Sequence, residues 1–130
     1  MLNLVLLSSG AGFILGWLQA QWQWSVEIAQ VLNGSVSYPL ENAFCHIAYK
    51  GWNIFNQIAV GLLELGINEK LASMIISGLC GALAFCACAV FTYALCADLF
   101  FSLASGAVVF FIHGNYTHGA NYALGLLGTD

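Results

Sequence analysis

The chain has 130 residues, of which 61% are hydrophobic and 6% are charged, and its formal net charge is −4. A soluble domain has about 45–50% apolar and about 25% charged residues, so the composition excludes a soluble cytoplasmic domain and a disordered chain. Nucleic-acid binding is excluded because it needs a basic patch, and the sequence has only 2 Lys and Arg residues together. The composition therefore predicts an all-α integral membrane protein, with residues 1–130 forming a single membrane domain.

The first predicted element is a transmembrane helix over residues 1–18. This stretch contains no charged residue and has about the minimum length that crosses a bilayer. No basic residue precedes its apolar run, which favours a transmembrane helix over a cleaved secretory signal. Tryptophans gather around its end and recur once later, as in an aromatic belt at the membrane surface. The predicted belt consists of Trp17, Trp22, Trp24 and Trp52.

Residues 19–70 are predicted to form an outer loop with two amphipathic helices lying in the membrane interface. Residues 21–32 alternate like a strand but also divide into a polar and an apolar helical face. A lone strand would leave its edges unpaired at the membrane, so an interfacial helix is favoured. Residues 51–67 place three amides and Glu64 within one narrow arc. This pattern is typical of a helix in the interface, or of one that lines a polar cavity.

Two further transmembrane helices are predicted over residues 71–97 and 99–112, with the turn between them at Asp98. The first of these is long enough to span a bilayer with some tilt, and the second is shorter. The fold class is thus about three transmembrane helices plus two interfacial helices. Residues 113–130 form a polar loop and the start of another apolar run. This ending suggests a fragment of a longer polytopic protein, with a short native subunit as the alternative.

Small residues recur at helical spacing in two of the predicted spans, where they would let helix backbones approach closely in lipid. The predicted partners are accordingly the lipid bilayer and other transmembrane helices, which belong either to the same longer chain or to partner subunits. The same small residues are also simply common in membrane helices, which is the alternative explanation. The predicted packing face consists of Gly12, Gly16, Ser73, Ser77, Gly81, Ala84 and Cys88.

The predicted location is the bacterial inner membrane, with a multi-pass topology. Because residues 51–67 are short and polar on one face, they are expected to lie flat. The N-terminus and Asp98 are then cytoplasmic and the loop over residues 19–70 is outside. Lys50 and Lys70 both oppose this orientation under the positive-inside rule. The inverted orientation therefore remains an alternative.

Glu27 and Glu41 are the candidate catalytic residues, since both lie in the predicted outer loop near aromatic and amide side chains. A carboxylate there can act as a general base or bind a divalent metal ion. The alternative is that both are solvated loop charges. Glu64 is expected to face water, and it would indicate a transporter only if its helix were buried in the bilayer.

No metal site is predicted, and no cofactor is assigned. The five cysteines are interpreted as packing residues. Cys86 and Cys88 lack the second pair of ligands that a zinc or iron–sulfur site needs. His113 and His118 are five residues apart, a spacing that fits no ligand motif well.

The predicted order of elements has a first span, an acidic outer loop with two surface helices, a long second span, a tight turn and a third span. This layout resembles the N-terminal part of the GT-C class of polytopic membrane glycosyltransferases. Residues 52–57 and 65–70 are also similar to multi-span bacterial proteins of this layout. The resemblance implies an enzyme that acts on lipid-linked sugars, in which Glu27 or Glu41 would bind a metal or deprotonate the acceptor. The alternative is a small non-catalytic subunit of a respiratory or photosynthetic complex, which would dock through the small-residue stripe around Gly81.

Overall fold

The computed structural model describes residues 1–20, 26, 29–30, 34 and 54–112. Four helices are given by this part of the chain: α1 (Leu2–Leu18), α4 (Ile54–Glu64), α5 (Glu69–Cys96) and α6 (Leu99–Ile112). The described residues are all-helical, as predicted. Within them, α5 is the one helix that is both long and apolar enough to cross a membrane, judged by length and composition. The helices α1 and α6 are shorter apolar helices.

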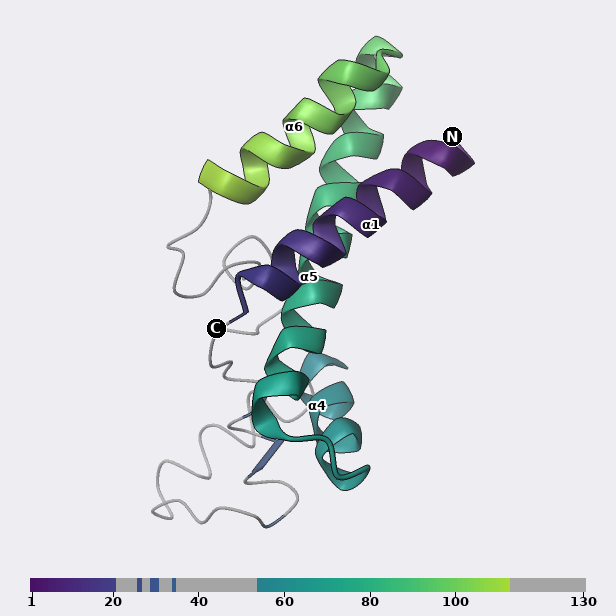
Figure 1. Ribbon diagram of the computed structural model, residues 1–130. Coiled ribbons are helices and arrows are strands. Elements are labelled where there is room, and N and C mark those ends of the chain that lie inside the picture. The colour runs from purple at the N-terminus through teal and green to yellow at the C-terminus, as the bar shows by residue number, and fades with distance from the viewer. Residues whose placement is uncertain (21–25, 27–28, 31–33, 35–53, 113–130) are drawn as a thin grey trace, which may run out of the picture.

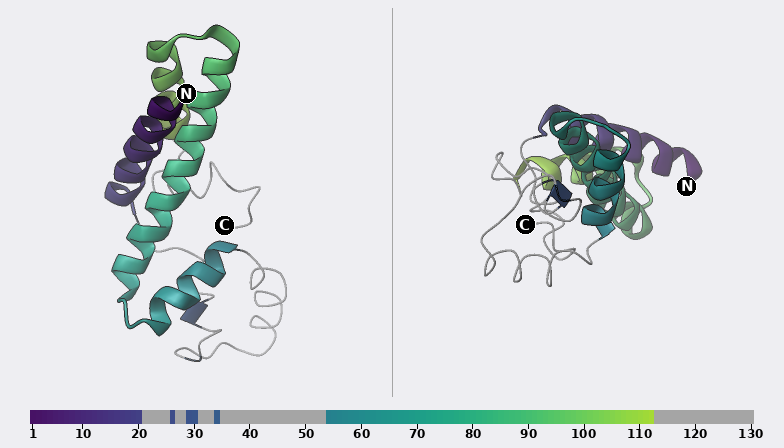
Figure 2. Two further views of the ribbon diagram at one scale, coloured as in Figure 1. Left: turned by 90° about the vertical axis from the view of Figure 1, so that its right-hand side faces the viewer. Right: turned by 90° about the horizontal axis from the view of Figure 1, so that it is seen from below.

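The helix α5 is the centre of the arrangement, and the other three helices pack against it (Figure 1). Its 28 residues correspond to about 42 Å at 1.5 Å per residue. The helix α1 crosses α5 near its middle, and α6 returns along its C-terminal half. The helix α4 lies beside its N-terminal end and diverges from it at an angle (Figure 2, left). The 17 residues of α1 and the 14 of α6 correspond to only about 26 and 21 Å.

Local capping groups explain where α5 begins and ends. The Asn68 side chain caps its first turn by accepting a hydrogen bond from the Leu71 backbone N–H, with 2.9 Å between the two atoms. The next residue, Glu69, places a carboxylate at the positive end of the helix dipole. At the other end Ala97 adopts a left-handed conformation with φ 53°, and its N–H donates to the Tyr93 carbonyl. Such a residue stops a helix by satisfying one of its free carbonyls.

The turn between α5 and α6 consists of Ala97 and Asp98. Asp98 caps α6, because its Oδ1 accepts a hydrogen bond from the Phe101 backbone N–H at 2.9 Å. The sequence places the turn at this same residue. A connection this short makes the two helices antiparallel neighbours.

The helix α4 has one buried face, formed by Phe55 and Ala59, which are 2% and 0% exposed. Both belong to the same apolar cluster as Ile76 and Cys80 of α5. Glu64 at the end of α4 is exposed. The helix is thus an amphipathic element packed on the base of α5, and it ends at Glu64, three residues before the end of the predicted range.

Candidate functional site

Glu27 and Glu41, the two candidate catalytic residues, lie outside the described residues. So do Trp22, Trp24 and Trp52 of the predicted belt, and also Cys45, His113 and His118. Close to Glu27 in the sequence, however, Val26 and Ala29 are described and are fully buried in the apolar cluster. The chain on both sides of Glu27 is therefore packed against the helices.

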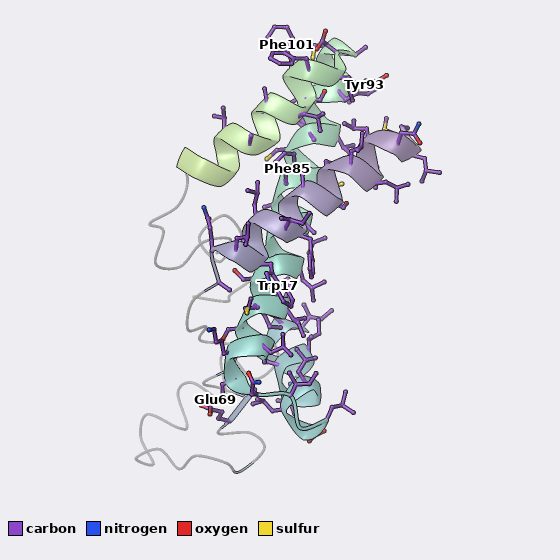
Figure 3. All side chains as sticks on the ribbon, viewed as in Figure 1. Trp17, Glu69, Phe85, Tyr93 and Phe101 are labelled. Carbon is purple, nitrogen blue, oxygen red and sulfur yellow. The ribbon has the colours of Figure 1, made fainter. Side chains whose placement is uncertain are left out.

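A hydrogen bond joins this segment to the polar end of α5. The Gln30 side-chain amide donates from Nε2 to Oε1 of Glu69, 39 positions later in the sequence. Gln30 is only 7% exposed, so its amide is removed from water and depends on this partner. Figure 3 shows Glu69 at the end of α5 that lies farthest from Tyr93. Sequence reasoning missed the role of Glu69, and the only local signal was the charged break around it.

Two further charged residues belong to this end of the bundle, Glu64 at the end of α4 and Lys70 in the first turn of α5, and both are exposed. This end of the bundle can therefore bind water, ions or polar head groups, whereas its flanks are apolar. Among the described residues, no three His, Cys, Asp or Glu side chains lie close enough together to hold a metal ion.

Part of the predicted packing face meets at the crossing of α1 and α5, where Gly12 and Gly16 lie against Gly81 and Ser77. A Cβ atom added to Gly12 would lie 2.6 Å from the Cβ of Phe85 and 2.8 Å from the carbonyl carbon of Gly81. A Cβ atom added to Gly16 would lie 2.8 Å from the carbonyl carbon of Ser77. Any larger residue at either position would have to push the α5 backbone away. The two glycines thus bring the backbones of α1 and α5 into direct contact.

The direction of these contacts is informative. In each case the atom nearest to the added Cβ is a backbone carbonyl oxygen of α5, that of Gly81 for Gly12 and that of Ser77 for Gly16. The Cα–H bond of each glycine on that side therefore points at a carbonyl oxygen. Such Cα–H···O contacts recur at close helix crossings and add a small stabilisation.

The predicted stripe on α5 faces the interior of the chain. Ser73, Ser77, Gly81 and Ala84 are buried and Cys88 is half-buried. The side-chain oxygens of Ser73 and Ser77 have no hydrogen-bond partner within the described part of the chain. Gly81 is buried and its backbone carbonyl contacts Gly12 of α1, so this part of the stripe is already covered within the chain.

Phe85 is placed between α1 and α6 (Figure 3). Its Cβ lies close to Gly12, and a Cβ atom added to Gly106 of α6 would lie 2.6 Å from the Phe85 ring atom Cε1. A similar contact occurs on the other side of the crossing, where the Phe13 ring covers Gly78. The sequence shows these aromatic and glycine residues separately, but not which of them pair.

Hydroxyl groups join α5 to α6. The Thr92 hydroxyl donates to the Ser105 Oγ atom at 2.7 Å, and the Ser105 hydroxyl lies 2.8 Å from the carbonyl oxygen of Ser102 and 3.4 Å from that of Cys88. One hydroxyl proton cannot serve both carbonyls fully, so the shorter of these two contacts is the stronger. Polar residues within apolar helices are a signal of an internal interface, but the sequence alone does not show which of these hydroxyl groups pair.

Trp17 of the predicted belt and four of the five cysteines are also among the described residues. The Trp17 ring is half-buried and lies beside the Phe13 ring, with 5.8 Å between the ring centroids and an angle of 34° between the ring planes. Cys80 is buried, Cys86 and Cys88 are half-buried and Cys96 is exposed, and all four are free thiols. Comparisons of the chain with protein-family models, with curated proteins and with solved structures found no match.

Proposed function

We propose that the chain is a multi-pass integral membrane protein, with α5 as its central span and α1 and α6 embedded beside it. The observation that supports this is the exposed apolar surface of all three helices. Leu6 and Ile14 of α1, Phe91 of α5, and Phe100 and Phe101 of α6 are each 60–75% exposed. Soluble monomers rarely leave so many large apolar side chains in water. In a bilayer, lipid acyl chains would contact these side chains, and no apolar surface would be exposed to water.

The antiparallel packing of α1 on α5 and the tight α5–α6 turn define the proposed topology. Gly12 lies opposite Gly81 and Gly16 opposite Ser77, so α1 runs against α5. The N-terminus and Asp98 then face the same side of the membrane, the cytoplasm of a bacterium, and Lys70 faces the other. Because α1 and α6 are shorter than the hydrocarbon core of about 30 Å, local thinning or tilt accommodates them.

Alkaline carbonate extraction and thiol labelling test this topology. The chain is expected to stay in the membrane pellet. In a background without other cysteines, Lys70→Cys should react with an impermeant maleimide in intact cells, and Cys96 should react only after the membrane is permeabilised. The reverse labelling would establish the inverted orientation. Labelling of both positions from one side would refute α5 as a span.

A second candidate function is a glycosyltransferase-like activity on lipid-linked sugars, with Glu27 as the leading catalytic carboxylate and Glu41 as the other candidate. The observation that favours it is the anchoring of the segment around Glu27 by the Gln30–Glu69 hydrogen bond and by the buried Val26. A carboxylate held at a membrane surface can deprotonate an acceptor or coordinate a divalent ion.

Sugar transfer by the full-length protein, from a lipid-linked donor, tests this candidate. Glu27→Gln or Glu41→Gln should abolish transfer, whereas Glu64→Gln, at an exposed position on α4, should not. Transfer retained by both of the first two variants would refute the catalytic role. Co-purification with partner subunits in fixed proportion, at a mass of 13.9 kDa for this chain, would instead support a non-catalytic subunit.

A further inference from the structure

Two serine side chains of α5 differ from the other buried serines of the described helices. Ser73 and Ser77 are 4% and 0% exposed, and within the described residues their hydroxyl oxygens have no hydrogen-bond partner. Ser8 and Ser102 are also buried, but each hydroxyl donates to the carbonyl oxygen four residues earlier, at 2.6 and 2.5 Å. A helical serine can satisfy its hydroxyl in this way. Because Ser73 and Ser77 do not, their hydroxyls are directed away from the α5 backbone.

The two hydroxyls belong to a line of polar side chains that starts at the polar end of α5. Glu69, Ser73 and Ser77 follow one another at intervals of four residues, so they share one face of the helix. The line is about 12 Å long, at 1.5 Å per residue. Its outer end is open to solvent, because Glu69 is exposed. There Glu69 accepts the hydrogen bond from the buried Gln30.

The crossing with α1 closes the inner end of this line. The next residue at the same spacing is Gly81, whose carbonyl oxygen lies against Gly12, while that of Ser77 lies against Gly16. The two backbones meet there without room for a methyl group. The line of polar side chains is therefore open at Glu69 and closed beyond Ser77.

We propose that this line is an internal hydration site, in which water molecules enter beside Glu69 and bind the hydroxyls of Ser73 and Ser77. A buried hydroxyl without a partner is unfavourable, and buried waters bind to such groups. Side chains four residues apart on a helix have Cβ atoms about 5–6 Å apart, and two successive hydrogen bonds of about 2.8 Å cover that distance. One water molecule can therefore bridge Ser73 and Ser77, and a second can bridge Ser73 and Glu69.

The composition of the line favours water over a metal ion. Its buried members, Gln30, Ser73 and Ser77, are all uncharged, and an ion bound among them would leave its charge unpaired in a buried site. The carboxylate of Glu69 is exposed and already accepts from Gln30. Water both donates and accepts, as the hydroxyl groups do, and brings no charge. The inference does not rest on the membrane location, since it follows from the burial of the two hydroxyls.

Hydrogen–deuterium exchange of introduced thiols tests the proposal, because its probe is water itself. Ser73→Cys and Ser77→Cys are made in the full chain with its own cysteines replaced by alanine. Infrared spectroscopy then follows the conversion of S–H to S–D after transfer into D2O. Ala72→Cys and Ile76→Cys are the matched controls, since both positions are 0% exposed and belong to the apolar cluster. We expect exchange at least tenfold faster at each serine position than at the control one residue earlier.

A further variant tests the route by which water enters. Ser73→Val, added to the Ser77→Cys chain, places an apolar side chain between Glu69 and the thiol, and should slow exchange at least tenfold. Equal exchange at the serine and control positions would overturn the proposal. So would exchange at position 77 that Ser73→Val leaves unchanged, because water would then not pass along this face of α5.

If circular dichroism shows that the variants lose helix content, the wild-type chain in detergent decides by nuclear magnetic resonance. Nuclear Overhauser effects from water to the Hβ protons of Ser73 and Ser77, but not to the methyl protons of Ala72 and Ile76, support the proposal. Their absence at either serine would overturn it. A chain lost from the carbonate pellet would refute the membrane location and leave the hydration site standing, so the two failures are distinguishable.

Discussion

Gly12 of α1 and Gly81 of α5 pack backbone against backbone, with the Cα–H of Gly12 directed at the Gly81 carbonyl oxygen. Four residues later the same relationship joins Gly16 to Ser77. Hydrogen is the only substituent that both positions on α1 can accept. The close crossing of α1 and α5 is therefore possible only because Gly12 and Gly16 have no Cβ atom. A single methyl group added at either position should destabilise it.

Gly12→Ala and Gly16→Ala should each destabilise the bundle by about 1–3 kcal/mol, the usual cost of overpacking a tight contact. The matched control is Gly10→Ala, because a Cβ atom at Gly10 meets nothing within 4 Å. That control should be neutral or stabilising by up to about 1 kcal/mol, since alanine favours helix over glycine. Loss of helix content during titration with a denaturing detergent measures all three. Equal stability of the three variants would contradict the packing described here.

Gly106→Ala on α6 should also be destabilising, because the new methyl group would meet the Phe85 ring 2.6 Å away. A side-chain ring can move where a backbone cannot, so we expect a smaller loss than at Gly12. Phe85→Leu should remove part of the clash, and the double variant should therefore be more stable than the sum of the two single changes predicts. Strict additivity would show that Phe85 and Gly106 do not interact. The measurement is a double-mutant cycle, in which the unfolding of the wild type, the two single variants and the double variant is compared under identical conditions.

Ala97→Gly should stabilise the α5–α6 turn by about 1 kcal/mol. Ala97 has φ 53°, a left-handed conformation that costs L-residues about 1–2 kcal/mol and glycine much less. Asp98→Ala should have the opposite effect, a loss of about 0.5–2 kcal/mol, because it removes the cap of α6. Asp98→Asn keeps a capping oxygen and serves as the control. A destabilising Ala97→Gly would mean that this residue is not left-handed in the membrane.

Thr92→Val and Ser105→Ala should each cost about 0.6 kcal/mol, the typical value for a hydrogen bond between membrane helices. Both changes remove the 2.7 Å bond between the two hydroxyls, so the double variant should lose less than the sum of the singles. Fully additive losses would show that the two hydroxyls act separately.

Features set by neighbouring residues could be predicted from the sequence. The ends of α6 coincide with the predicted range 99–112, and Asp98 lies in the turn, because charge, capping and hydropathy are local signals. The close contacts around Gly12 and Gly81 agree with the spacing of small residues. The sequence does not specify that Phe13 covers Gly78, or that Phe85 meets Gly106, since each pairing depends on how two helices cross.

The candidate site was less accessible to sequence reasoning than the helices. The sequence shows Glu69 only as part of a charged break, because its partner Gln30 is 39 positions away and belongs to a different element. The residues next to a single carboxylate in a connecting segment do not show whether that carboxylate is catalytic. Glu27 and Glu41 therefore stay predictions, and only the packing of Val26 and Ala29 favours Glu27.

Gln30→Glu should weaken the attachment of this segment to α5, because it would place a second carboxylate against Glu69. A second carboxyl group at a position that is 7% exposed is unfavourable, because the site offers it no partner of opposite charge. Gln30→Glu with Glu69→Gln restores one amide and one carboxylate, and should recover the attachment. The rate of protease cleavage between residues 21 and 53 measures this attachment. We expect faster cleavage in Gln30→Glu than in the wild type, and a rate near that of the wild type in the exchanged pair. Equal cleavage in all three chains would show that the Gln30–Glu69 bond does not hold this segment.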